Sequence, residues 1–486
     1  MSGFAVNPAG TYAERMTALV FSSLPFLFLY LPIVLAVYFL LPKNGRNAFL
    51  FAASLVFYAW GEPVYVLLML FTIAFGWLAG LLLAHWQDDR RKAKSVLVMS
   101  LLVNLGILGF FKYGNFVVEN VNRIPGLHLQ GLNLLLPLGI SFYTFQVLSY
   151  TIDVYRKESP AQPDFFSFGA YISMFPQLIA GPIVRYHSIA LQLKRRQVSL
   201  PLFGSGAGLF TVGLAKKVLL ANNIGVLWDN IKSMAQGDMT VLAAWAGMAA
   251  FGLQLYFDFS GYSDMAVGLG RMLGFHFEQN FFFPYVSRSI TEFWRRWHIS
   301  LGTWFREYLY IPLGGSRHGN RATVVNLLVV WAATGLWHGA NWNFMFWGLY
   351  YFVFLVCERF LWGNLLASLP KAVRHVYTLL VVLAGWGLFV FEDLDSLGAF
   401  MFALGGQAAG GWINERILYY LSSWGVMVLI AAIGATPLPS AVFRHMEEKW
   451  PALAAWAKPA LMLVGLLLSV AYLVDSSYNP FLYFRF

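Results

Sequence analysis

The chain has 486 residues, of which 59% are hydrophobic, 18% are aromatic and only 12% are charged. An ordinary soluble domain has about a quarter charged residues, so this composition excludes one and indicates an all-α polytopic integral membrane protein. The formal net charge is +10. In a membrane protein such an excess of Lys and Arg marks the cytoplasmic loops, and we expect no nucleic-acid partner.

The first apolar stretch runs without a charge from Met16 to Pro42 and has no small-residue cleavage site. We therefore interpret it as a retained membrane span rather than a signal peptide. Residues 1–15 are predicted to be a polar N-terminal extension, and either Met1 or Met16 is the native start. Residues 16–486 are predicted to form a single membrane domain.

Uncharged runs long enough to cross a bilayer recur along this domain, and we expect 11 or 12 transmembrane helices. Re-entrant and interfacial helices are expected beside them, around a central cavity. The predicted spans lie near residues 24–41, 48–60, 63–84, 95–111, 132–152, 203–228, 239–257, 323–340, 342–362, 376–391, 417–435 and 459–474.

The charged loops between these spans predict the orientation of the chain. The basic residues of three loops fall on one side, which is then the cytoplasmic side. The acidic residues that follow residue 391 fall on the opposite side. The basic residues are Lys43, Arg46, Arg90, Arg91, Lys92, Lys94, Arg185, Lys194, Arg195 and Arg196.

Three stretches are too polar or too broken for plain spans. Residues 165–188 contain Pro176 and Pro182 inside an apolar run, a pattern typical of a re-entrant segment. Residues 256–264 place Asp258 directly after a span. Residues 271–322 are basic and aromatic, and we expect them at the cytoplasmic interface.

Within that third stretch, residues 290–311 have the period of one amphipathic helix, which Pro312 and the following glycines would end. His298 falls at the edge of its apolar face and should point into the protein. A histidine at this place needs no special task, so its position alone favours a packing role. Arg295 and Arg296 fall on the polar face, where they serve either as interfacial anchors or as a docking surface for a phosphate-bearing donor.

The longest uncharged run lies between Arg321 and Glu358. One helix of that length would far exceed a hydrocarbon core of about 30 Å, so residues 323–362 should form two helices with a break around His338. Gly335 and Gly339 would let a neighbouring helix approach closely. An ionisable group at membrane depth is expensive, so His338 is either a packed residue bonded to a neighbour or a general base.

Two further residues bear on the chemistry. Asp258 adjoins a span and should pair with a base, for which an arginine of residues 295–306 or a histidine is the natural partner. Cys357 lies in an apolar run and reads as a buried hydrophobe. The sequence has no CxxC, HExxH, GxSxG or phosphate-loop motif, so we expect no metal and no bound cofactor.

Six motifs taken together resemble the bacterial membrane-bound O-acyltransferase (MBOAT) family, and most closely its alginate O-acetyltransferase branch. The resemblance extends in the same order from Met16 to Phe486. The motifs are LLPLGISFYTFQVLSYTIDVYR, PQLIAGPIVRY, QLYFDFSGYSDMAVGLG, FWRRWHISLGTWFREYLYIPLGG, GLWHGANW and YNPFLYFRF.

The resemblance implies an inner-membrane enzyme that moves an acetyl group from a cytoplasmic thioester to a hydroxyl of an extracytoplasmic polysaccharide. Acetyl-CoA is the implied donor substrate. His338 and His298 match the two family histidines. His338 would be the base and His298 would lie near the thioester, while Asn341 or a backbone amide would stabilise the oxyanion. We expect the donor or the substrate to be bound by Asp258, Arg295, Arg296 and Trp342.

The resemblance also implies partners besides the membrane lipids, among them a periplasmic acetyltransferase of the SGNH type or another type. Alginate is the first candidate acceptor, before cellulose and peptidoglycan. If the donor stays in the cytoplasm, a narrow cavity should open toward both faces and meet at His338. The alternatives are a channel or flippase, and a structural subunit of a polysaccharide export complex, in which His338 would be dispensable.

Overall fold

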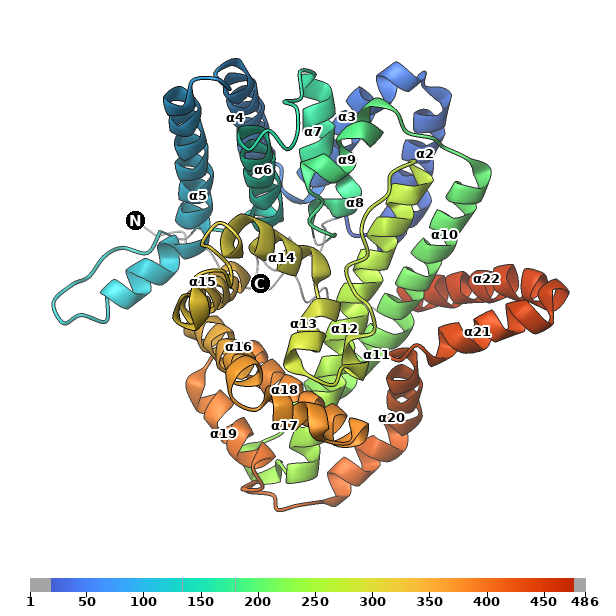
Figure 1. Cartoon of the computed structure of the whole chain (residues 1–486). Coiled ribbons are helices and arrows are strands. Elements are labelled where there is room, and N and C mark those ends of the chain that lie inside the picture. Colours follow the sequence, from blue (N-terminus) through green and yellow to red (C-terminus); the bar gives the residue numbers. More distant parts are fainter. Residues whose placement is uncertain (1–18, 133, 180, 476–486) are drawn as a thin grey trace, which may run out of the picture. The chain divides into compact units, whose positions relative to one another are not determined.

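A computed structural model describes residues 19–132, 134–179 and 181–475 (Figure 1). Every regular element within these ranges is helical, and none of the described residues lies in a strand, which confirms the all-α architecture. The proposed extension over residues 1–15, the alternative start at Met16 and the terminal YNPFLYFRF motif lie outside the described residues.

The chain divides into two compact units, one made of Met1–Ala207 with Met265–Phe277 and the other of Gly208–Asp264 with Glu278–Phe486. The single membrane domain that we expect over residues 16–486 stays a prediction. Helices α10 (Leu200–Ala215) and α12 (Val241–Met272) contribute residues to both units. The first unit also contains η1 (Phe26–Tyr30), α2 (Leu31–Leu40), η2 (Lys43–Gly45), α3 (Arg46–Gly61), α4 (Val66–His85), α5 (Arg90–Val121), α6 (Ile140–Tyr155), α7 (Phe165–Ser173), α8 (Phe175–Leu178) and α9 (Tyr186–Lys194).

The second unit carries all of the residues discussed as a site below. Its helices from η3 to α16 are η3 (Lys216–Ala221), α11 (Asn222–Lys232), η4 (Gln236–Asp238), η5 (Pro284–Val286), α13 (Ile290–Arg296), α14 (Ile299–Phe305), η6 (Arg306–Tyr310), α15 (Gly319–His338) and α16 (Trp342–Phe360). They are followed by α17 (Gly363–Ser368), α18 (Lys371–Val390), α19 (Leu394–Leu404), α20 (Glu415–Gly434), α21 (Leu438–Lys449) and α22 (Pro451–Asp475).

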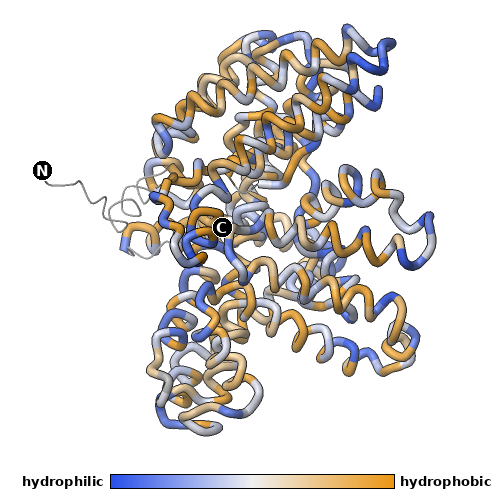
Figure 2. The backbone as a smooth tube through the Cα atoms, turned by 90° about the vertical axis from the view of Figure 1, so that its left-hand side faces the viewer, coloured by the Kyte–Doolittle hydropathy of each residue, from blue (hydrophilic) through white to orange (hydrophobic). Residues whose placement is uncertain are grey.

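Seven of the described helical segments are long and apolar enough to cross a membrane, which makes this a multi-pass membrane protein. Hydrophobic residues follow these helices over most of their length (Figure 2). The seven are fewer than the 11 or 12 spans predicted. Helices form at the other predicted spans, but α3 and α6 have only 16 residues each. The seven segments are Val66–His85, Arg90–Val121, Leu200–Lys232, Val241–Met272, Lys371–Val390, Glu415–Gly434 and Pro451–Asp475.

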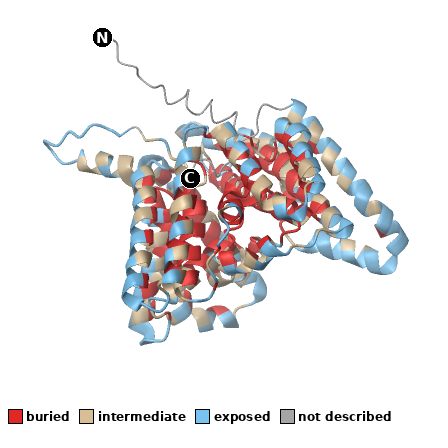
Figure 3. Cartoon of the chain, turned by 90° about the horizontal axis from the view of Figure 1, so that it is seen from above, coloured by how far each residue is buried: buried red, intermediate tan, exposed pale blue. Residues whose placement is uncertain are grey.

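These spans differ widely in burial. In α12, 72% of the most apolar window is buried, against 11% in α20 and 6% in α22. Figure 3 draws exposed residues pale blue, intermediate ones tan and buried ones red. In a bilayer the apolar surface of α20 and α22 would face lipid, so α12 is the helix that the second unit packs around.

Helix α12 corrects one prediction. We expected a span to end before residue 258, but the helix continues to Met272 with Asp258 and Asp264 inside it. The reason is that each carboxylate is paired. Lys217 Nζ lies 2.7 Å from Asp258, and Lys216 Nζ lies 2.6 Å from Asp264. Paired carboxylates no longer have to leave an apolar environment, so the helix need not end.

The segment over residues 165–188 is broken as predicted. Helix α7 has nine residues and α8 has four, so neither approaches the length needed to cross a bilayer. Ser173 and Gln177 are buried here, and the side-chain amide of Gln177 donates to the carbonyl of Tyr171. Phe175 N–H at the break donates to the Ser54 hydroxyl at 3.1 Å, so protein satisfies this backbone group, as a re-entrant segment requires.

Helices α15 and α16 form a tight hairpin around the predicted break. The helical structure of the uncharged run stops after His338 and resumes at Trp342, as the sequence predicted. An added Cβ atom at Gly335 would overlap the carbonyl oxygen of Phe344, and one at Gly348 would lie 2.5 Å from that of Trp331. The two backbones touch because these positions are glycine, which confirms the predicted close approach.

We therefore expect Gly335→Ala to weaken the hairpin. The extra methyl group should reduce the free energy of unfolding by about 1–3 kcal/mol, the usual cost of overpacking. The matched control is Gly425→Ala in α20, where an added Cβ meets nothing within 4 Å. Thermal unfolding of the purified protein in detergent measures both, and equal midpoints for the two variants would contradict the packing argument.

Candidate functional site

His298 lies at a break between two short helices of the second unit. We predicted one helix over residues 290–311, and this is wrong: α13 ends at Arg296 and α14 begins at Ile299. His298 adopts left-handed φ and ψ of 46° and 53°. The cause is a non-local backbone pairing. Phe282 N–H donates to the carbonyl of Arg296, and Ile299 N–H donates to that of Asn280, both at 2.9 Å.

The side chain of Asn280 fixes the tautomer of His298. Its Oδ1 accepts from the backbone N–H of Ser300 at 3.1 Å and from the Ser300 hydroxyl at 2.9 Å. A backbone N–H can only donate, so the atom facing it is the amide oxygen. His298 Nδ1, 3.2 Å from the same oxygen, must then carry the proton and donate. The other ring nitrogen, Nε2, is left with a lone pair.

His298 is buried, as predicted, with 2% of its surface exposed. Its Nε2 has no hydrogen-bond partner among the described residues. Removal from water disfavours the charged ring, so burial lowers the pKa of His298 from 6.5 to about 3. The imidazole is therefore neutral at physiological pH, with Nε2 able to accept a hydrogen bond or a proton.

A cavity of about 620 Å³ lies against His298. We call it the His298 cavity. It is lined by α13 and α14 on one side and on the other by the α15 residues Leu327, Val330, Trp331 and Thr334. From Leu327 to Thr334 the cavity follows α15 for about 10 Å, at 1.5 Å per residue. It reaches to within one helical turn of His338.

His338 is the last residue of α15 and has 7% of its surface exposed. Its ring is packed among aromatic rings: Trp347 at 4.9 Å, Trp337 at 5.0 Å and Phe389 at 5.3 Å between centroids. All three contacts are edge-to-face. Trp337 also contacts the ring of His298 at 5.9 Å, so one side chain touches both histidines.

Aromatic rings separate His338 from the His298 cavity. We expected a cavity that meets at His338, but His338 is not among the residues that line this one. Trp294 and Trp331 form part of the wall, and both pack on Trp347, at 5.4 Å and 6.1 Å, which in turn contacts His338. We name Trp294, Trp331 and Trp347 the aromatic partition.

The two arginines predicted for donor binding take different places. Arg295 lines the His298 cavity and has no ion pair or side-chain hydrogen bond to any described residue. Arg296 does not line it. Its guanidinium lies 2.8 Å from Glu292, donates to the carbonyl of Phe282 at 3.2 Å and lies over the ring of Phe282. Arg296 thus stabilises the break rather than facing the cavity.

The remaining predicted residues lie outside the His298 cavity. The ion pair of Asp258 is formed with Lys217 from η3, not with the arginine or histidine that we named, although the next residue, Phe259, contacts the His298 ring at 4.8 Å. Asn341 caps α16 through its side-chain oxygen, which accepts from Trp342 N–H at 2.6 Å. Its side-chain NH₂ is the group left to donate. Trp342 is 41% exposed.

Two residues of the site were not predicted. Asn280, which fixes His298, lies 18 residues before it along the chain. Asn343 is fully buried, and its side-chain amide donates at 3.2 Å to the carbonyl of Phe389, whose ring contacts His338. The only sequence feature that could have pointed to these two residues is that each is a polar asparagine in an apolar segment. That feature does not show which residue the asparagine binds.

Comparison with known proteins identifies relatives of this chain. Residues 63–400, which include both histidines, match the model of the MBOAT, membrane-bound O-acyltransferase family. The chain is 39% identical over 502 residues to the probable alginate O-acetylase AlgI of Azotobacter vinelandii, covering 96% of this chain and 100% of that one. It is 44% identical to that of Pseudomonas aeruginosa over 381 residues, 78% and 73% of the two chains. The peptidoglycan O-acetyltransferase of Helicobacter pylori is 31% identical, with 97% and 98% covered.

The neutral state of His298 predicts a pH dependence of stability. Its pKa in the folded protein lies below the ordinary value of 6.5, so as the pH falls the unfolded chain binds the proton first and the folded state loses stability. Between pH 7 and pH 5 one such histidine accounts for about 2 kcal/mol. We expect His298→Gln, which can still donate to Asn280, to lose less stability over this interval than the wild type.

The control for this prediction is His445→Gln, because His445 is exposed on α21. Since each substitution also changes stability by itself, the compared quantity is the difference between thermal midpoints at pH 7 and pH 5. If this difference is the same in His298→Gln as in the wild type, the folded protein accommodates the charged imidazole as readily as the neutral one, which would contradict the prediction.

Proposed function

Because the chain belongs to the membrane-bound O-acyltransferase family and is a membrane-bound acyltransferase, we propose that it moves an acetyl group from a cytoplasmic thioester to the hydroxyls of an extracytoplasmic polysaccharide. The observation that carries the proposal is the His298 cavity. It brings a neutral imidazole with an unpartnered Nε2 next to a path along α15 that ends one turn before His338.

The predicted orientation supports this direction of transfer. It places residues 271–322 and 363–375 on the cytoplasmic side and the α15–α16 break toward the outer side. Helix α15 then runs outward from Gly319 to His338, and the cavity follows it in the same direction. A donor in the His298 cavity would lie on the inner side of the aromatic partition, and an acceptor would reach His338 from the outer side.

The chemistry needs a base because a hydroxyl is a poor nucleophile at neutral pH. We propose that His338 removes the hydroxyl proton while the oxygen attacks the thioester carbonyl carbon. The tetrahedral intermediate then collapses, the carbon–sulfur bond breaks, and the proton passes from His338 to the departing sulfur. The Asn341 NH₂ or a backbone amide would stabilise the oxyanion.

His298 has a different role in this proposal. Its Nδ1–H is held by Asn280, which leaves Nε2 as the ring nitrogen without a partner among the described residues, and a neutral nitrogen with a lone pair accepts hydrogen bonds. We place it beside the thioester arm of the donor, where it would receive an N–H group and hold the carbonyl toward His338. For the two parts to meet, the rings of the aromatic partition must shift.

The acceptor is proposed from the relatives. Two relatives have names that specify alginate, and a third has a name that specifies peptidoglycan. We propose a polysaccharide acceptor, with alginate first because the identities of 39% and 44% exceed the 31% of the peptidoglycan relative. Acetyl-CoA as donor, a periplasmic acetyltransferase as partner and location in the bacterial inner membrane belong to the same proposal.

The central test is His338→Ala, and His338→Gln beside it. Loss of a general base should reduce acetyl transfer by about 10²–10⁴-fold. Mass spectrometry of surface glycans from cells that carry each variant measures the acetyl content, with the amount of protein in the membrane matched.

His445→Ala is the matched control for that test, since it removes an exposed histidine from the same unit. It should leave acetylation at the wild-type level. Full acetylation in His338→Ala would rule out His338 as the base and would favour a structural subunit, for which this residue is dispensable.

A further inference from the structure

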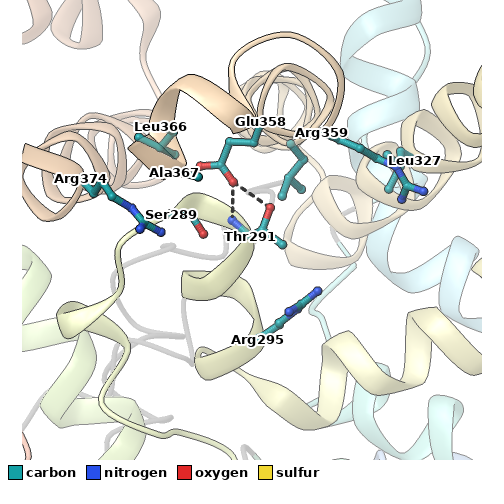
Figure 4. A pocket seen from close by; sticks show the side chains of 11 residues that line it. Ser289, Thr291, Arg295, Leu327, Glu358, Arg359, Leu366, Ala367 and Arg374 are labelled. Carbon is teal, nitrogen blue, oxygen red and sulfur yellow. Dashed lines mark hydrogen bonds between the residues drawn. The ribbon is translucent and has the colours of Figure 1, made fainter. Parts of the chain in front are cut away.

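A second cavity, of about 420 Å³, adjoins the His298 cavity and is rich in arginine (Figure 4). We call it the arginine cavity. Thr291, Arg295, Leu327 and Leu355 line both cavities, so the two are chambers that share a wall. The arginine cavity is completed by α16, α17 and α18, including Arg359 and Arg374.

The three arginines have no charge partner among the described residues. Arg295, Arg359 and Arg374 come from three different helices, α13, α16 and α18, and the structure gives none of their guanidinium groups an ion pair. Arg359 only lies over the ring of Phe360, at 5.5 Å. Three unpaired cations around one small cavity repel one another, and so the arrangement favours an anion between them.

The one carboxylate in the wall does not neutralise them. Glu358 is buried and accepts hydrogen bonds from Ile290 N–H at 2.6 Å, from Thr291 N–H at 2.9 Å and from the Thr291 hydroxyl at 2.7 Å. Tyr377 adds a fourth donor at 3.3 Å. Figure 4 shows this carboxylate turned toward Thr291. Glu358 thus caps the N-terminus of α13, where a negative charge is favourable.

Arg374 gives the most direct indication of a ligand. Its Nε is buried and has no hydrogen-bond partner among the described residues. A buried guanidinium N–H left unsatisfied is costly, and such groups normally bind a carboxylate or a phosphate. The unpartnered donor belongs to a residue of the cavity wall.

We propose that Arg295, Arg359 and Arg374 form a binding site for the phosphate groups of the acyl donor. This rests on the proposed function, because it makes the donor a phosphate-bearing pantetheine thioester whose arm extends from the arginine cavity into the His298 cavity. Arg295 lies at the shared wall and would bind the phosphate nearest to the arm. The predicted orientation puts all three arginines on the cytoplasmic side, where such a donor is found.

The test uses the full-length protein in nanodiscs of phosphatidylcholine, with coenzyme A and pantetheine as probes. Pantetheine has the same arm without the phosphates. We expect Arg374→Gln and Arg359→Gln each to weaken coenzyme A binding about tenfold or more, as is typical when a charge-assisted hydrogen bond is lost. Pantetheine binding should stay unchanged. Arg374→Lys, which keeps the charge but loses the fork of donors, should weaken binding less.

Arg288→Gln is the matched control, since Arg288 is an exposed arginine next to Ser289 that lines neither cavity. It should bind coenzyme A like the wild type. Equal binding of coenzyme A by the wild type and by the variant lacking all three arginines would overturn the proposal. The proposal would also be overturned if the wild type does not bind coenzyme A but is stabilised by added phosphatidylglycerol, and if this stabilisation needs the three arginines. That result would assign the site to a lipid headgroup.

The same measurements separate this site from the acyl-transfer chemistry. His338→Ala should bind coenzyme A with wild-type affinity although it transfers no acetyl group. If the wild type binds coenzyme A through the three arginines yet acetylates no glycan, the phosphate site stands and the proposed function fails. If the wild type acetylates glycans but the arginine substitutions leave coenzyme A binding unchanged, the proposed function stands and the phosphate site fails.

Discussion

The hydrogen bonds of Asn280 hold the geometry on which the site depends. A left-handed backbone at a residue other than glycine costs about 1–2 kcal/mol, so the φ of 46° at His298 persists only if its surroundings stabilise it. Asn280 does so with its main-chain carbonyl and its side-chain oxygen, which together receive donors from His298, Ile299 and Ser300. The same bonds end one helix, begin the next and fix the tautomer of the ring between them.

The core helix of the unit supports this site through paired charges. Two carboxylates inside α12 would be costly in an apolar environment, and breaking one such buried pair typically costs 3–5 kcal/mol. Consecutive lysines of the π-helical turn η3 pair with them, so α12 continues without a break past both carboxylates. Phe259, next to Asp258, then lies against His298. The Lys217–Asp258 ion pair holds the face of α12 on which the histidine packs.

What the sequence could predict follows from the range of the interactions involved. The break after His338 and the close approach at Gly335 depend on neighbours within about ten residues, and they were predicted. The burial of His298 was predicted from the apolar pattern around it, although the residues that pack on it, Phe259 and Trp337, are distant in sequence. The break at His298 was not, because its cause is an asparagine 18 residues away whose partner no helical period reveals. Lys217 lies about 40 residues from Asp258 and was missed for the same reason. Short helices such as α3 and α6 explain part of the excess of predicted spans. Helices α15 and α16 have 20 and 19 residues, so length does not explain their absence from the seven.

The division into two chambers fits the physical problem of moving an acyl group through a membrane protein. Phosphates in an apolar interior are prohibitively expensive, whereas an acetyl thioester is neutral and passes among aromatic rings at little cost. On our proposal the charged end of the donor stays at Arg295, Arg359 and Arg374, and only the neutral arm enters the His298 cavity. A neutral imidazole is the suitable neighbour there, because a charged one would need a counterion and no carboxylate is among the described residues that line the His298 cavity. The aromatic partition then lets the acetyl group approach His338 while keeping water and phosphate away from it.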